Sequence, residues 1–222
     1  MRKIFNPTIL ILTFSLGVII VTVFLSIQNI QNQKPKNIPP IANDLVANSN
    51  SEDEESYAVY SALIENIYVN KNRKLLVFEE ETTGCNPMKV YELFKETENQ
   101  ALNKFADLSN ETLHNFQNKR KHCDFLKSDF DVSIKYVFVN KKEIDHLITQ
   151  NNNPFWDEFF AKYPNSGSLI SFSKIGFNRE MTQALVYTEF GCGSLCAEGD
   201  FVLLRKKNNT WIVENKMPIW AA

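Results

Sequence analysis

The sequence predicts an α+β domain behind an N-terminal transmembrane helix, and three observations lead to this prediction. A charge-free apolar run, TILILTFSLGVIIVTVFLSI, occupies residues 8–27. Apolar residues at helical spacing dominate the next part of the chain, and four closely spaced strand-like runs fill the last quarter. Helices mostly first and strands mostly last are typical of α+β domains. We expect a helical region with two strands packed on a C-terminal four-stranded antiparallel meander.

The apolar run has the length of a helix that crosses a bilayer. It lacks the small-residue pair at which a signal peptide is cleaved, and a core helix is rarely apolar on every face. We therefore predict an uncleaved anchor at residues 8–27, with a cleaved signal peptide as the alternative.

The orientation of the anchor depends on the parts that flank it. Lysine and arginine are nearly balanced on its two sides, so the positive-inside rule does not decide. The N-terminal flank is short, and the long C-terminal part contains four cysteines, which suit an oxidising compartment. We expect residues 1–7 in the cytoplasm and residues 51–222 outside it, either periplasmic or on the cell surface of a single-pass membrane protein.

The composition of residues 28–50 predicts a flexible tether, because this segment is rich in Asn and Gln, contains prolines and shows no helical or strand period. Ser51 and Glu54 then form a capping-box pattern, which predicts that the first helix of the domain begins at Ser51. Apolar residues follow at helical spacing, namely Tyr57, Tyr60, Ile64, Ile67 and Tyr68.

The middle of the chain alternates strands and helices. Residues 74–80 and 133–139 are strand-like, and a helical region is expected between them, over about 88–121. Asn153 and Pro154 begin a short helix that ends at Pro164. Its aromatic side predicts packing against a sheet rather than a ligand cage, and consists of Phe155, Trp156, Phe159, Phe160 and Tyr163.

The last quarter changes to strand periodicity. Strand-like runs at 169–177, 183–190, 201–206 and 211–214 are separated by short polar or glycine-rich connections. Strands this close together, without helices between them, pair as an antiparallel meander.

The motifs SFSKIGFN, QALVY, CGSLCAEG, DFVLLRK, WIV and the terminal Ile219-Trp220 resemble the C-terminal part of uncharacterised bacterial exported proteins. In that family a "GFN…QALVY" strand pair precedes a glycine-rich turn and a "YVLL-K…W" hairpin. The resemblance covers the last quarter well and the helical part loosely. It implies a bacterial envelope protein and carries over no activity and no catalytic residue.

Four cysteines, Cys85, Cys123, Cys192 and Cys196, allow three disulfide pairings. Cys192 and Cys196 share one glycine-rich loop that suits a small ring, which favours Cys192–Cys196 with Cys85–Cys123. The alternative is a redox-active Cys-x-x-x-Cys. Acidic neighbours oppose the reactive thiolate, and here they replace the basic residues that would favour it, so we expect a structural bridge.

Composition and motifs exclude several function classes. The chain has 24 basic and 26 acidic residues, and the part beyond Arg2 and Lys3 has a formal charge of −4, which argues against nucleic acid as a partner. The three histidines, His114, His122 and His146, lack the spacing of a metal site. The acidic run 79–81 could bind a hard cation or simply be solvated, and Ser194 lacks a nucleophile elbow. We predict no catalytic, cofactor or metal site.

Two function hypotheses remain. The first is a non-enzymatic module that binds a protein or another component of the cell envelope, through the meander face or the loop between Cys192 and Cys196. The alternative is an extracytoplasmic hydrolase or thiol-redox enzyme whose site is assembled from scattered residues. An enzyme requires an enclosed pocket with convergent polar groups, whereas a binding module requires an accessible surface.

Overall fold

The computed structural model describes residues 41–69, 73–86, 105–149 and 154–222. Contacts divide the chain into two units, Met1–Ser49 and Asn50–Ala222, and the described strands all belong to the second unit. The anchor predicted at residues 8–27 and the first part of the tether lie outside the described residues. None of the helices in the described ranges combines the length and the apolar character needed to cross a membrane.

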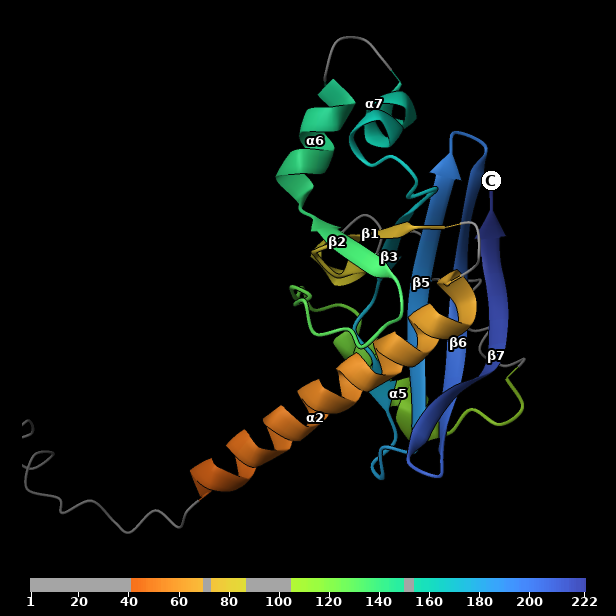
Figure 1. Cartoon of the computed structure of the whole chain (residues 1–222). Coiled ribbons are helices and arrows are strands. Elements are labelled where there is room, and N and C mark those ends of the chain that lie inside the picture. The colour runs from red at the N-terminus through yellow and green to blue at the C-terminus, as the bar shows by residue number, and fades with distance from the viewer. Residues whose placement is uncertain (1–40, 70–72, 87–104, 150–153) are drawn as a thin grey trace, which may run out of the picture. The chain divides into compact units, whose positions relative to one another are not determined.

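The second unit is an α+β domain, as predicted, and is built on one mixed sheet. Its strands lie in the order β2-β1-β3-β5-β6-β7, and β4 pairs with β5 (Figure 1). The strands are β1 (Leu75–Glu79), β2 (Lys135–Val139), β3 (Leu169–Phe172), β4 (Gly176–Phe177), β5 (Gln183–Gly193), β6 (Cys196–Lys207) and β7 (Thr210–Ala221). The helices are α2 (Ile41–Leu63), the π-helical turn η1 (Ile64–Tyr68), the 3₁₀ turn η2 (Thr83–Cys85), α5 (Asn110–Lys119), α6 (Lys141–Thr149) and α7 (Phe155–Lys162).

The position of strands β1 and β2 differs from the predicted architecture in one respect. They are hydrogen-bonded into the same sheet as the C-terminal strands instead of packing on it, because β1 pairs in parallel with both β2 and β3. Parallel neighbours need a long crossover connection. The chain between the neighbours β1 and β2 spans residues 80–134 and includes η2 and α5, and helices α6 and α7 then lead from β2 to β3 on the other side of β1.

The C-terminal strands form the predicted antiparallel arrangement, with β5, β6 and β7 longer than the sequence indicates. The run expected at 169–177 is split into β3 and β4, and both pair with β5. At the break, Tyr187 N donates to the Ser173 hydroxyl at 2.9 Å, and Ser173 N donates to the Tyr187 carbonyl at 2.9 Å. The serine side chain therefore replaces one bond of the ladder.

Helix α2 begins at Ile41, so the predicted helix start at Ser51 is wrong. The capping pattern at Ser51 and Glu54 lies inside the helix, and residues 41–50 are helical where a tether was expected. The predicted apolar stripe does face the interior: Tyr60, Ile64 and Tyr68 are buried.

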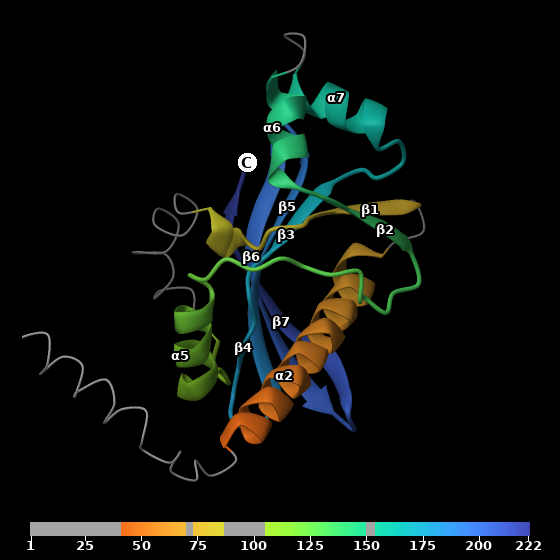
Figure 2. The same ribbon diagram turned by 90° about the vertical axis from the view of Figure 1, so that its left-hand side faces the viewer.

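Both faces of the central strands are buried, which explains why their sequences are almost continuously apolar. Along β5, Ala184 and Val186 pack in the cluster that contains α2, whereas Leu185 and Tyr187 pack in the cluster that contains Phe116 of α5. Helices α2 and α5 accordingly lie on opposite sides of the sheet (Figure 2).

Of the remaining helices, α5 and α7 lie where the sequence predicted helices, whereas α6 was not predicted. Helix α5 begins after Ser109, whose hydroxyl accepts from Thr112 N at 3.1 Å, and it is the described part of the helical region expected over 88–121. Helix α7 confirms the predicted aromatic core, since Phe159 is fully buried. Helix α6 was not predicted, although Asn140 caps it by accepting from Glu143 N at 3.0 Å.

Replacing Gly176 with alanine should destabilise the domain, because a Cβ there would lie 2.4 Å from the backbone of Phe116. Overpacking of this kind costs about 2 kcal/mol or more. Gly167→Ala is the control: its position is open apart from the Arg73 side chain but has a φ of 70°, so only about 1 kcal/mol of backbone strain is expected. Urea unfolding of both variants measures the difference, and equal losses would contradict a close contact between β4 and α5.

Candidate functional site

A groove of about 730 Å³ lies between helix α2 and the segment 127–131. The turn between β6 and β7 closes it on a third side. Its lining residues come from three parts of the chain that are far apart in sequence: Asp53, Glu54, Tyr57, Ala58, Ser61, Ala62, Glu65 and Asn66 from helix α2 and η1, Lys127, Asp129 and Asp131 from the segment, and Asn209, Thr210 and Trp211 from the turn.

Hydrogen bonds hold the segment 127–131 against helix α2. Lys127 N donates to the Tyr57 hydroxyl at 2.7 Å, and Asp131 N donates to the Ser61 hydroxyl at 2.9 Å. The Ser61 hydroxyl in turn donates to the Tyr57 carbonyl at 2.7 Å, one turn earlier in the helix. Both ends of the segment are thus fixed, and the side chains of Lys127, Asp129 and Asp131 line the groove.

The sequence Asp129-Phe130-Asp131 explains why this wall is acidic. The Phe130 ring is buried and lies 5.7 Å from the Tyr57 ring and 5.4 Å from the Phe78 ring. Because Phe130 is turned into the core, the aspartates on either side of it remain exposed.

Four carboxylates of the groove are not used inside the protein. In the part of the chain that the structure describes, Asp53, Glu54, Asp129 and Asp131 have no hydrogen-bond donor or ion-pair partner for their side chains. Lys127 is the one cation that lines the groove there. The charge of the groove is therefore negative and unneutralised.

The pKa of Tyr57 reflects the negative charge of the groove. Burial raises the pKa of its hydroxyl, and the negative charges of Asp129, Asp124 and Asp53 raise it further. The hydrogen bond from Lys127 N acts in the opposite direction without cancelling the increase. Carboxylates on both walls consequently act on the same point of the groove.

An apolar floor lies between the charged walls. Ala58 and Ala62 supply one side of it, and Trp211, with only 4% of its surface exposed, supplies the other. Trp211 Nε1 donates to Glu55 at 2.8 Å, and Lys206 forms an ion pair with the same carboxylate. Glu55 is thus neutralised and holds the indole in place.

The segment before the groove wall is fixed to η2. The Cys85–Cys123 disulfide joins the two, with 4.1 Å between the Cα atoms. Thr82 N donates to the Asp124 carbonyl at 2.9 Å, and Asp124 N donates back to the Thr82 hydroxyl at 3.1 Å. The wall at 127–131 therefore begins from a cross-linked base.

The second disulfide, Cys192–Cys196, closes the turn between β5 and β6, with 5.1 Å between the Cα atoms. Disulfide bonding, predicted from the cysteine pattern, is thus confirmed. Leu195 between the two cysteines is 90% exposed. This turn lies at the opposite end of β6 from the turn to β7 (Figure 1), which contributes Asn209 and Thr210 to the groove.

A second cavity, of about 430 Å³, lies at the carboxyl ends of β1 and β2, where sheets with parallel strands often bind ligands. Glu79 and Glu81 of the predicted acidic run line it. Glu81 accepts from Lys141 N at 3.0 Å, and the Lys141 ammonium pairs with Asp145 at 3.1 Å. Glu81 is thus engaged in a hydrogen bond, and Lys141 and Asp145 neutralise each other.

The histidines are not brought together. His114 lies in α5, His122 follows that helix, and His146 lies in α6. Within the described ranges, no three His, Cys, Asp or Glu residues are grouped so that they could hold a metal ion. Ser194 lies in the turn closed by Cys192 and Cys196.

Two groups with shifted pKa values are engaged in ion pairs. Burial raises the pKa of Asp200, whose Oδ2 lies 3.0 Å from Lys216 Nζ. Burial, followed by repulsion from Lys174, lowers the pKa of Lys119 to about 8, and Lys119 pairs with Glu52. We interpret both pairs as structural.

Removing the Cys85–Cys123 bridge should loosen the groove wall as well as destabilise the domain. The chain-entropy model gives a loss of about 4 kcal/mol for Cys85→Ser/Cys123→Ser and about 2 kcal/mol for the control, Cys192→Ser/Cys196→Ser. Amide exchange at Lys127 and Asp131 should increase in the first variant only. Unchanged exchange there would contradict the role of the bridge as the base of the wall.

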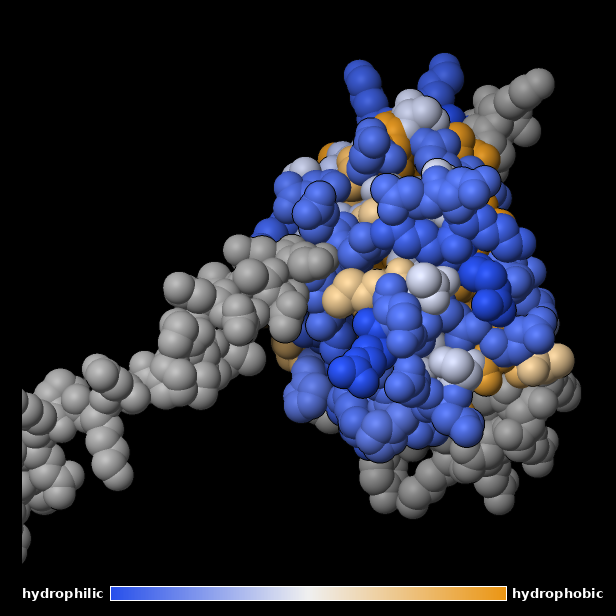
Figure 3. Space-filling view, turned by 90° about the horizontal axis from the view of Figure 1, so that it is seen from below, coloured by the Kyte–Doolittle hydropathy of each residue, from blue (hydrophilic) through white to orange (hydrophobic). Residues whose placement is uncertain are grey.

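The face of the molecule seen from below is predominantly hydrophilic among the described residues, with only small apolar areas (Figure 3). No protein family, curated protein or solved structure matches this chain.

Proposed function

We propose that the protein is a non-enzymatic binding module of the cell envelope that docks a partner protein in the groove beside helix α2. Residues 8–27 anchor it in the membrane, and residues 51–222 work outside the cytoplasm. The observation that carries this proposal is a set of four carboxylates that have no partner among the described residues, on two walls joined by hydrogen bonds.

Carboxylates without a partner among the described residues, held on a fixed scaffold, contribute more to the recognition of a partner than to the stability of the fold. An exposed carboxylate contributes little to folding. It contributes to association by steering a partner of opposite charge and by excluding partners of like charge. The 430 Å³ cavity differs in this respect, because Glu81 there accepts a hydrogen bond from Lys141 N and Asp145 is paired with the Lys141 ammonium.

The exposure of the groove carboxylates favours binding over catalysis. Asp53, Glu54, Asp129 and Asp131 are all exposed to solvent. General acid–base catalysis by a carboxyl group requires burial or a charged neighbour that brings its pKa near the working pH. These four side chains remain in contact with water, as is usual at the rim of a protein interface.

The disulfides support the proposed location. Disulfides persist in the periplasm and at the cell surface and are rare in the cytosol. The two bridges are placed at two separate turns of the fold, which suits a domain that matures in an oxidising compartment.

The topology predicts that residues 51–222 are digested when protease is added to spheroplasts, while a cytosolic marker protein stays intact. The cysteines of protein trapped from intact cells should be unreactive toward a maleimide until a reductant is added. Protection of the domain until lysis, together with reactive thiols, would overturn the proposed location.

The docking function predicts a partner that contacts Ala58. A photo-crosslinking amino acid placed at Ala58, on the groove floor, should form a defined adduct in intact cells. The same residue at Lys142, on the exposed side of α6, is the control and should not form this adduct. Equal adducts from both positions, or none from Ala58, would contradict docking in the groove.

A further inference from the structure

The dimensions of the groove limit what can fill it. Its lining extends along the helix from Asp53 to Asn66, which corresponds to about 20 Å at the helical rise per residue. An extended peptide of about six residues has this length. The groove has a volume of about 730 Å³ and is open to solvent.

We propose that the groove binds an extended basic segment, about six residues long, of a partner protein. Lysine or arginine side chains of this segment reach the two acidic walls, and an apolar side chain packs on the floor made by Ala58, Ala62 and Trp211. This proposal rests on the proposed docking function and adds the chemistry of the partner to it.

The charges of the two walls carry the proposal. Five carboxylates and one lysine line the groove, giving a formal charge of −4. Glu65 is the fifth carboxylate, and it accepts from the Ser133 backbone N–H and hydroxyl, which fixes its position without neutralising it. Because like charges repel at close range, an acidic partner is excluded and a basic one is attracted.

The carboxylates are also spread along the groove. Asp53 and Glu54 lie at its beginning on the helix, and Glu65 lies about three helical turns later. Asp131 is held opposite Ser61, near that later end, by the bond between its N–H and the Ser61 hydroxyl. A segment with basic residues at both ends therefore matches the groove better than one compact cation does.

The apolar floor of the groove favours a peptide over a small polyamine as the ligand. A polyamine satisfies the carboxylates but leaves the apolar floor exposed, whereas a peptide with an apolar side chain covers the floor as well. Burial of apolar surface is favourable in proportion to the area removed from water. We therefore expect the peptide to bind more tightly than a polyamine of equal positive charge.

The test uses the purified full-length chain in non-ionic detergent and fluorescence anisotropy of labelled hexapeptides. The peptide KLKALK should bind, and ELEALE should not. Asp129→Asn/Asp131→Asn should weaken binding of KLKALK about tenfold, which corresponds to the loss of two favourable charge contacts. The charge-matched control, Asp107→Asn/Asp157→Asn, removes two exposed aspartates outside the groove lining and should bind as the original chain does.

Three outcomes would overturn the proposal: equal binding of the basic and acidic peptides, equal weakening by both double variants, or displacement of KLKALK by spermidine at the same concentration as by unlabelled peptide. Ala58→Arg, which blocks the groove with a positive charge, should abolish peptide binding and provides a second variant. An adduct at Ala58 without KLKALK binding would refute the basic segment and leave the docking function standing. Loss of both would refute both.

Discussion

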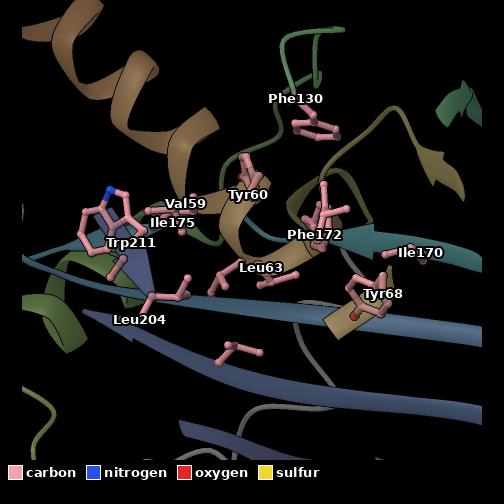
Figure 4. Packing of buried hydrophobic residues seen from close by; sticks show 14 of the residues in the cluster. Val59, Tyr60, Leu63, Tyr68, Phe130, Ile170, Phe172, Ile175, Leu204 and Trp211 are labelled. Atoms are coloured by element: carbon pink, nitrogen blue, oxygen red, sulfur yellow. The ribbon is translucent and has the colours of Figure 1, made fainter. Parts of the chain in front are cut away.

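The burial of the Phe130 ring is the contact on which the candidate site depends. The ring lies 5.3 Å from Tyr136 of β2, 5.4 Å from Phe78 of β1 and 5.8 Å from Tyr60 of helix α2. One side chain thus joins two strands and a helix that are distant in sequence. Figure 4 shows it beside Tyr60 and Phe172 at the border of the core. The acidic wall exists because this aromatic residue is fixed between two aspartates.

The burial of the central strands limits which surfaces of the domain a partner can reach. Residues 183–188 of β5 and 199–204 of β6 are buried, because their two faces pack into the clusters that contain α2 and α5. The meander face considered from the sequence is for this reason unavailable along those residues. Accessible features gather at strand ends and beside helix α2, where backbone segments leave the sheet and polar side chains reach water.

The sequence predicted what depends on local periodicity. The aromatic side of α7 and the strands β5 to β7 have strong patterns, because each element buries one or both faces over several residues. Helix α6 was missed because its nine residues contain only three apolar positions, Ile144, Leu147 and Ile148, too few for a clear helical period. The pairing of β1 with β3, and the contact between Lys127 and Tyr57 that closes the groove, join distant segments that no local pattern specifies. The one local sign of the groove was an aromatic residue between two acids at 129–131, which predicts an inward ring and outward charges beside a core.

The bond between Cys85 and Cys123 also makes the intervening chain a covalently closed ring. Hydrolysis of any single peptide bond inside that ring would leave the two resulting polypeptides attached to each other. The half that carries the groove wall would stay tethered to the half that carries helix α2. A single cut by a protease at such a bond would therefore leave the two parts joined, and they would separate only after reduction.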